Sequence, residues 1–150
     1  MVSCFCGSQQ LFQQCCERLL KGKLIAQSPE QLMRSRYSAF ATQNEPYLRK
    51  TWHPKTCPTD LTLSPPKEQK WVKLVIHESH QEGKQGHVHF TASSLHGKNA
   101  LILSEKSLFV REAGQWFYYN GVCEVEEYPV SRNQPCLCGS QKKLKRCCML

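Results

Sequence analysis

A pattern of four cysteines occurs twice in this chain, once near each end, and no other feature constrains the fold as strongly. The first copy reads CFCGSQQLFQQCC over residues 4–16, and the second reads CLCGSQKKLKRCC over residues 136–148. Seven of the thirteen positions are identical, and the copies are offset by 132 residues. The shared spacing predicts that each copy folds into the same small unit around its four sulfur atoms.

The spacing within each copy suits a zinc ion, which takes four tetrahedral ligands at Zn–S distances of about 2.3 Å. Gly7 and Gly139 follow the leading cysteine pairs, and glycine accepts the positive φ angle of a tight turn. Ser8 and Ser140 are then predicted to cap a short helix that returns the second cysteine pair to the metal. The predicted zinc ligands are Cys4, Cys6, Cys15, Cys16, Cys136, Cys138, Cys147 and Cys148.

Disulfide bonds and a redox role of the adjacent cysteines are the alternatives to metal binding. The first residues, MVSCFCGSQQ, lack the basic and apolar segments of a secretory signal peptide, so we expect a cytoplasmic protein with reduced thiols. No run of 18 or more apolar residues occurs, so no membrane insertion is expected. Thiolates that bind zinc remain oxidisable, which leaves a redox role open. Cys57 and Cys123 match neither copy and are expected to be buried or free thiols.

The segment between the two copies has the pattern of helices followed by antiparallel strands. Ser28-Pro29 with Gln31 predicts a capping box at the start of one helix. Asn44 predicts the cap of a second helix, which ends at His53-Pro54. A loop over 55–69 precedes strand patterns over 71–79, 86–94, 101–111 and 115–119. This order predicts an α+β fold with helices on one face of a curved antiparallel sheet.

The net charge of +8 is distributed unevenly. Residues 1–28 carry +2, residues 29–131 carry +1, and residues 132–150 carry +5. We predict that these segments are an N-terminal zinc knuckle, a central α+β domain and a C-terminal zinc knuckle. A zinc ion with four thiolates carries about −2, which leaves the last segment at about +3. The basic residues between the C-terminal cysteine pairs are Lys142, Lys143, Lys145 and Arg146.

This basic cluster is the candidate partner-binding site, and an acidic protein surface is the predicted partner. Nucleic acid is the second candidate, because zinc knuckles occur in RNA recognition. The segment KKLKRCCML has no aromatic residue, however, and so offers no platform on which bases could stack. Alternatively, the cluster is a solvated face that balances the charge of the zinc thiolates.

A pocket in the central domain is the alternative functional site, used by an enzyme or by a small-ligand binder. Its candidate residues are Tyr37, His53, Glu105 and the pair His87 and His89. The structural alternatives are that His53 orders a helix end, that Glu105 is exposed beside Lys106, and that the histidine pair is an exposed polar face. Arg34 and Arg36 are expected on a solvated helix face, with anion binding as the alternative. No nucleophile beside a base is recognisable, so we expect a binding protein rather than an enzyme.

Several motifs resemble known families. Each cysteine copy is similar to the SEC-C zinc motif of the preprotein translocase motor SecA, although Gln9 and Gln141 stand where that motif usually has glycine. The segments MRSRYSAF (33–40), TWHP (51–54) and GQWFYYNG (114–121) resemble the YchJ-like family of uncharacterised bacterial proteins. The resemblance implies a nuclear-transport-factor-two-like middle domain, whose helices pack into a cone-shaped, cystatin-like sheet. Analogy with SecA implies an acidic, SecB-like chaperone as partner.

Overall fold

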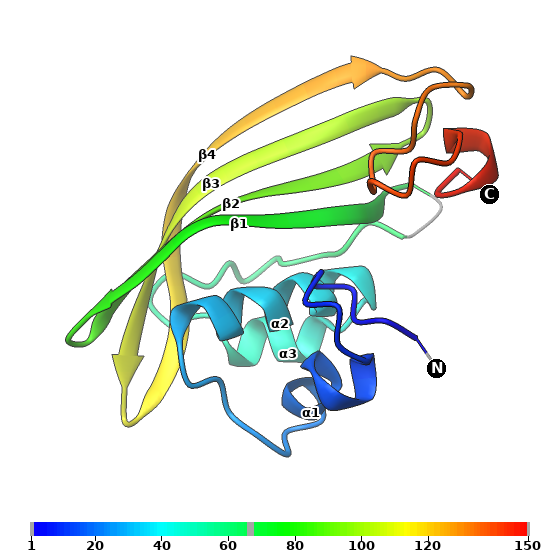
Figure 1. The fold of residues 1–150 in the computed structure, drawn as a ribbon. Coiled ribbons are helices and arrows are strands. Elements are labelled where there is room, and N and C mark those ends of the chain that lie inside the picture. The colour runs from blue at the N-terminus through cyan, green and yellow to red at the C-terminus, as the bar shows by residue number, and fades with distance from the viewer. Residues whose placement is uncertain (1, 66–67, 150) are drawn as a thin grey trace.

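The computed structural model describes residues 2–65 and 68–149, which form a curved four-stranded sheet with helices against one face (Figure 1). The strands are β1 (Lys70–Glu82), β2 (Gln85–His96), β3 (Asn99–Glu112) and β4 (Gln115–Pro129). The helices are α1 (Cys16–Leu20), α2 (Pro29–Ala41) and α3 (Glu45–Lys50), with 3₁₀ turns η1 (Phe12–Gln14) and η2 (Leu144–Arg146). The predicted α+β fold class is confirmed.

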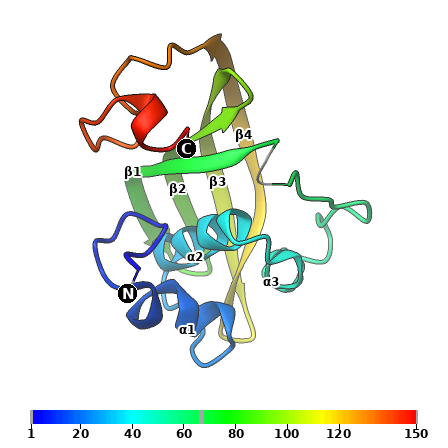
Figure 2. The same ribbon diagram turned by 90° about the vertical axis from the view of Figure 1, so that its right-hand side faces the viewer.

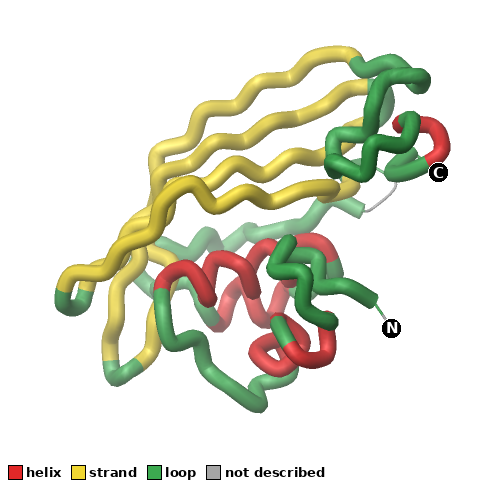
Figure 3. The backbone as a smooth tube through the Cα atoms, viewed as in Figure 1, coloured by secondary structure: helices red, strands yellow, loops and turns green. Residues whose placement is uncertain are grey.

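The sheet is an antiparallel meander in which each strand pairs with the next one along the chain. Ala113 and Gly114, with φ angles of 52° and 77°, form the tight turn between β3 and β4. Register shifts occur within the β1–β2 and β3–β4 pairs, and such bulges increase local twist. The sheet therefore curves around α2, as the backbone trace in Figure 3 shows.

Local capping residues begin both central helices. Ser28 Oγ accepts a hydrogen bond from the Gln31 N–H (3.1 Å) at the start of α2. The Gln31 side chain accepts a hydrogen bond from the Gln27 N–H (2.6 Å) and not from the Ser28 N–H. The second hydrogen bond of the predicted capping box is therefore shifted by one residue. Asn44 Oδ1 accepts from the Tyr47 N–H (3.1 Å) and caps α3 as predicted. In the described part of the chain, no helix combines the length and apolar character needed to cross a membrane.

The inner face of the sheet supplies half of the main core. Val88, Phe90 and Ala92 alternate along β2 and are buried against α2, while His87 points to the outer face and is exposed. The last strand differs from the prediction, because β4 continues to Pro129. This extension lies at the edge of the sheet with exposed side chains, so it carries no alternating hydrophobic pattern. The helix α3 also ends at Lys50, before the predicted stop.

Candidate metal centres

Each cysteine motif gathers its four sulfur atoms into one cluster, in which all four lie within 4.8 Å of one another. In the N-terminal cluster, the Sγ atom of Cys15 lies 3.7 Å from that of Cys6 and 4.0 Å from that of Cys16. The equivalent distances in the C-terminal cluster are 3.5 and 3.9 Å. A tetrahedral zinc ion separates its sulfur ligands by about 3.8 Å. No disulfide joins any of the ten cysteines, and each cluster could hold one metal ion.

Residues with positive φ angles build the turn after the leading cysteines. Gly7 and Gly139 have φ angles of 79° and 85°, as the zinc prediction required. Gln9 and Gln141 both follow with a φ angle of 69°. A non-glycine residue in this conformation costs about 1 kcal/mol. The two copies therefore keep the same left-handed backbone even though glutamine replaces the usual glycine.

Ser8 and Ser140 do not have the helix-capping role that we predicted. The 3₁₀ turns η1 and η2 begin four residues later, and no side chain caps them. The two serine hydroxyls instead lie 3.2 Å from the sulfur atoms of Cys15 and Cys147. Each hydroxyl oxygen also accepts a backbone N–H from two residues further on (3.3 Å). The serine proton is thus available for a thiolate, so these residues support the ligands from a second layer.

The cysteine pKa values shift in opposite directions within each cluster. Hydrogen bonds from Cys16 and Cys6 lower the pKa of Cys4 well below its ordinary value. The contact with Cys4 raises the pKa of Cys16. Burial acts to raise the pKa of Cys138, but hydrogen bonds from Ser140 and neighbouring thiols outweigh it and lower the pKa to about 6. Burial raises the pKa of Cys148. Each cluster therefore stabilises a thiolate, the form of cysteine that binds metal.

The N-terminal cluster is part of the main core. Cys4, Cys6 and Cys16 are 6%, 0% and 2% exposed, and they pack in one continuous cluster with residues of α2 and the sheet. The Sγ atom of Cys4 lies 3.7 Å from the hydroxyl of Ser38 in α2. The first copy is therefore not a separate unit, because its sulfur atoms pack against α2 in the main core.

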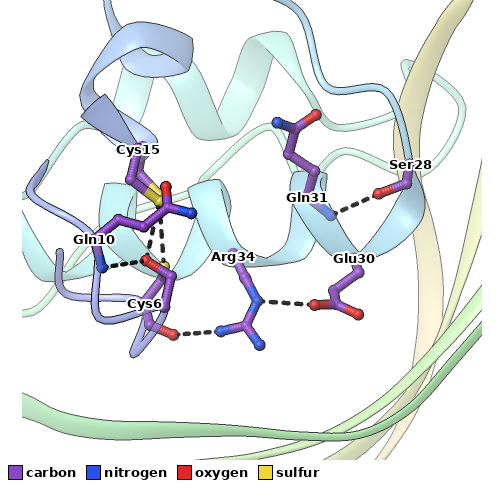
Figure 4. A network of polar contacts seen from close by, with 9 residues as sticks. Cys6, Gln10, Cys15, Ser28, Glu30, Gln31 and Arg34 are labelled. Atoms are coloured by element: carbon purple, nitrogen blue, oxygen red, sulfur yellow. Dashed lines mark hydrogen bonds and ion pairs between the residues drawn. The ribbon is translucent and has the colours of Figure 1, made fainter. Parts of the chain in front are cut away.

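Arg34 of α2 is hydrogen-bonded to the N-terminal cluster, as Figure 4 shows. Its Nη1 donates to the carbonyl oxygen of Cys6 (2.7 Å), and its Nε donates to the carboxylate of Glu30 (3.0 Å). The prediction of a freely solvated arginine is wrong at this position, because the N-terminal segment covers this side of the helix.

The C-terminal cluster lies beside the end of the sheet and apart from the helices (Figures 1 and 2). It packs against Leu95 and Val72 in a small apolar cluster that is separate from the main core. Cys136 is buried, and the other three ligands are partly exposed. Lys142, Lys143 and Arg146 are exposed, and Lys145 is partly exposed. The equivalent N-terminal positions are Gln10, Leu11, Gln13 and Gln14, so the two copies share a sulfur geometry but differ in burial and charge.

Comparison with known proteins agrees with both the fold and the motifs. The family model of the middle NTF2-like domain of YchJ matches residues 28–121, and that of the SEC-C motif matches residues 132–150. A UPF0225 protein of Enterobacter sp. (strain 638) is 41% identical over 151 residues, which are 97% of this chain and 96% of that relative. The chain belongs to the YchJ-like UPF0225 family. The resemblance seen in the sequence is confirmed, and the SEC-C motif is a metal-binding one.

Two solved structures share the fold of this UPF0225 chain. A SEC-C motif-containing protein from Rhodopseudomonas palustris, determined in solution, is 31% identical and has a TM-score of 0.74; the match covers 81% of this chain and 98% of that one. A crystal structure of a SEC-C motif-containing protein from Psychrobacter arcticus is 26% identical, with a TM-score of 0.69. That match covers 99% of this chain and 96% of the other.

The central domain brings together two of the five predicted pocket residues. Tyr37 and Glu105 line a cavity of about 220 Å³ between α2 and the sheet, whereas His53 does not line it. Glu105 is 8% exposed, so the alternative that it is exposed beside Lys106 is wrong. The alternation of β3 turns Glu105 to the inner face and leaves Lys106 exposed on the outer one. Arg36, expected on a solvated helix face, also lines the cavity and is buried.

The predicted histidines lie outside the cavity. His53 is buried behind α3, where its Nδ1 accepts the Lys55 N–H (3.1 Å) and its Nε2 contacts the carboxylate of Glu112. Because Nδ1 is an acceptor, Nε2 carries the proton, and the ring orders the chain after the helix. His87 and His89 lie on the outer face of the sheet, where the ring of His87 stacks on that of His80. Among the described residues, the two cysteine clusters are the groups of three or more potential metal ligands that lie close enough for one ion.

Replacing both Cys57 and Cys123 with serine is expected to leave the metal content unchanged. Both residues lie outside the clusters: the Cys57 thiol faces the Pro58 carbonyl (3.7 Å), and the Cys123 thiol faces Glu105 (2.9 Å). Elemental analysis of the double variant beside the unmodified protein makes the comparison. A Cys138→Ser variant, which removes a cluster ligand, is the control for loss of an ion. Loss of one ion from the double variant would show that the assigned ligand sets are incomplete.

Proposed function

We propose that this protein binds two zinc ions and that its C-terminal zinc knuckle docks on an acidic protein partner. The observation that carries the proposal is the contrast between the two copies of the motif. The N-terminal copy is embedded in the main core, whereas the C-terminal copy is attached through a small separate cluster and exposes its basic residues. The first copy is suited to hold the fold together, and the second is suited to contact another molecule.

Zinc is the proposed metal because each cluster consists of four cysteine sulfur atoms at tetrahedral spacing. Soft thiolate ligands in this geometry select zinc or an iron–sulfur centre, and closed four-cysteine sites are typical of structural zinc. The open, water-bearing position that a catalytic zinc ion needs is absent from a site with four protein ligands. The proposed role of both ions is therefore structural.

Protein produced with zinc available is expected to contain close to two zinc ions per chain. The reason is that each four-sulfur cluster offers a complete ligand set for one ion. Elemental analysis after gel filtration measures the content, and absorption spectroscopy distinguishes colourless zinc from a coloured iron–sulfur centre. Fully reduced protein that takes up no zinc, or that holds iron in its place, would contradict the assignment.

Charge favours the C-terminal knuckle as the docking surface. Each metal centre carries about −2, and the N-terminal copy has no basic residue between its cysteine pairs. The C-terminal copy has four, so its surface is positive despite the thiolates. Complementary charge speeds encounter and contributes to specificity, and salt screens it over about 8 Å at physiological strength. Docking is therefore expected to weaken as the salt concentration rises.

Changing the four basic residues of the knuckle to glutamine is expected to abolish docking without loss of zinc. The changed positions are Lys142, Lys143, Lys145 and Arg146. A control variant changes four exposed lysines elsewhere, which lowers the net charge equally; these are Lys50, Lys55, Lys84 and Lys98. Both variants and the unmodified protein are compared by pull-down at several salt concentrations, with and without nuclease treatment. Mass spectrometry identifies the proteins that each one recovers.

The control variant is expected to recover the same acidic proteins as the unmodified protein. Recovery of the same partners by the knuckle variant would reduce the basic cluster to charge balance for the thiolates. If nuclease treatment removes the recovered partners, the ligand of the knuckle is RNA and not an acidic protein.

A further inference from the structure

The cavity beneath α2 has walls that suit one flat aromatic molecule. Six aromatic side chains line it; they are Tyr37, Phe40, Trp52, Trp71, Phe90 and Tyr118. The cavity volume of about 220 Å³ exceeds the roughly 150 Å³ of an apolar protein cavity known to bind benzene. The space therefore fits a single aromatic ring that bears a small substituent.

Arg36 places a buried positive charge at this cavity. The residue is 3% exposed, and its Nη1 donates to the carbonyl of Leu48 (2.9 Å) and the hydroxyl of Thr51 (2.7 Å). Its guanidinium carbon lies 4.9 Å from the ring centre of Trp52 and 4.8 Å from that of Tyr118. Burial lowers the pKa of Arg36 to about 10, so the group stays charged at neutral pH. Within residues 2–65 and 68–149, the hydrogen bonds of this guanidinium group both come from Nη1, which leaves Nε and Nη2 for a ligand.

Glu105 places a buried carboxylate at the same cavity. Its Oε2 accepts hydrogen bonds from Ser107 (2.5 Å) and Tyr118 (2.9 Å), and its Oε1 accepts one from the thiol of Cys123 (2.9 Å). The backbone of Gly121 leaves room for this side chain, because a Cβ atom there would lie 2.5 Å from Oε2. Oε1 can accept a second donor, since each carboxylate oxygen has two lone pairs.

The two charges do not pair with each other. No salt bridge within 4.0 Å joins Arg36 to Glu105 in the described structure. Burying two separate opposite charges is costly unless hydrogen bonds satisfy both of them. The cavity as a whole is neutral, so a charged ligand would leave one of the two buried charges uncompensated.

We propose that this cavity binds a flat, uncharged aromatic molecule that accepts a hydrogen bond from Arg36 and donates one to Glu105. The aromatic walls hold the ring, and the two charged side chains orient its polar groups. Neutrality of the cavity excludes aromatic anions and cations as the preferred ligands. This site is independent of the proposed docking by the C-terminal knuckle, because it uses no residue of that segment.

Four probes of similar size test the proposal: benzamide, benzoate, benzamidinium and toluene. Benzamide combines an aromatic ring with a carbonyl acceptor and N–H donors and has no charge. It is expected to bind at least about ten times more tightly than the other three. Toluene lacks the hydrogen bonds to the two charged groups, and benzoate or benzamidinium would leave one of the two buried charges uncompensated. Titrations monitored by the indole N–H signals of Trp52 and Trp71 measure the affinities, and Trp116, which does not line the cavity, is an internal reference.

Two variants make the test specific to this cavity. Glu105→Gln keeps the shape but leaves Arg36 as the single buried charge, so benzoate is expected to become preferred over benzamide. Ala92→Leu fills the cavity and is expected to reduce benzamide binding at least tenfold, with circular dichroism reporting whether the fold is kept. The proposal is overturned if no probe binds at millimolar concentration, if the unmodified protein prefers a charged probe, or if Glu105→Gln leaves the ranking unchanged.

Discussion

Cys6→Ser is expected to destabilise the whole domain, whereas the equivalent change Cys138→Ser is expected to leave the central domain folded. Cys6 is fully buried, and its cluster shares a continuous core with α2 and the sheet. The change removes a buried sulfur atom from the core and, with it, one of the four ligands that would anchor residues 2–20 through a metal ion. The Cys138 cluster contacts mainly the apolar patch around Leu95, so its loss affects the end of the chain.

The difference should be large enough to measure by thermal or urea unfolding. Metal binding at a structural site contributes directly to folding free energy. We expect Cys6→Ser to lower the free energy of unfolding by at least about 3 kcal/mol, or about 10 °C in Tm for a domain of this size. For Cys138→Ser we expect a change of about 1 kcal/mol or less, because few core contacts depend on that cluster.

The two serine variants are matched, since each removes the second cysteine of the same motif. Elemental analysis should find one ion fewer in each, which establishes that both lost a metal site. Equal destabilisation by the two changes would show that burial of the N-terminal cluster does not determine its contribution to stability. Hydrogen exchange should show local opening at residues 132–149 in the Cys138 variant and global loss of protection in the other.

Gly86→Ala is expected to lower the free energy of unfolding by about 2–3 kcal/mol, although it adds a single methyl group. An added Cβ at this position would lie 2.2 Å from Cγ and 2.9 Å from Cβ of Pro29, and 3.2 Å from the ring of Trp116. Pro29 opens α2, and its ring is rigid, so either the helix or the strand must shift. Overpacking of this kind typically costs 1–3 kcal/mol.

A second change at Pro29 tests this explanation directly. In a Gly86→Ala, Pro29→Ala double variant the Cγ atom is absent, so part of the lost stability should return as a favourable coupling energy. Gln85→Ala, at the exposed neighbouring position, is expected to change stability by less than about 0.5 kcal/mol. Urea unfolding of the unmodified protein, Gly86→Ala, Pro29→Ala and the double variant completes the cycle. Purely additive effects would contradict the contact between helix and strand as the cause.

Signals that depend on neighbouring residues were readable from the sequence. Ser28 and Asn44 cap their helices because capping uses a side chain and a backbone N–H only three residues apart. The cysteine spacing brings the four sulfur atoms together because Gly7 allows the tight turn within the same thirteen residues. The roles of Ser8 and Ser140 could not be read in this way. A serine before a helix has the same pattern whether it caps that helix or faces a sulfur atom.

Signals that depend on which surfaces meet were not readable. Arg34 and Arg36 lie two residues apart on one helix, yet one binds the Cys6 carbonyl and the other is buried beside Trp52. The burial of Glu105 depends on which face of β3 the helices cover, and alternation alone gives two equivalent faces. The extension of β4 to Pro129 depends on backbone pairing with β3, since its own side chains are exposed.

The sequence by itself determined the fold class, the family and the two four-sulfur clusters, because these follow from local turns, caps, alternation and motif spacing. Only the tertiary structure decided that two copies of one motif have different surroundings. The N-terminal copy ends where α1 begins and packs against α2 and the sheet, where its sulfur atoms are buried in the main core. The C-terminal copy follows an edge strand and packs against a small apolar patch, so its charged side chains remain exposed to water. Burial is a property of the surface that a segment meets, and a motif does not encode that surface within its own residues.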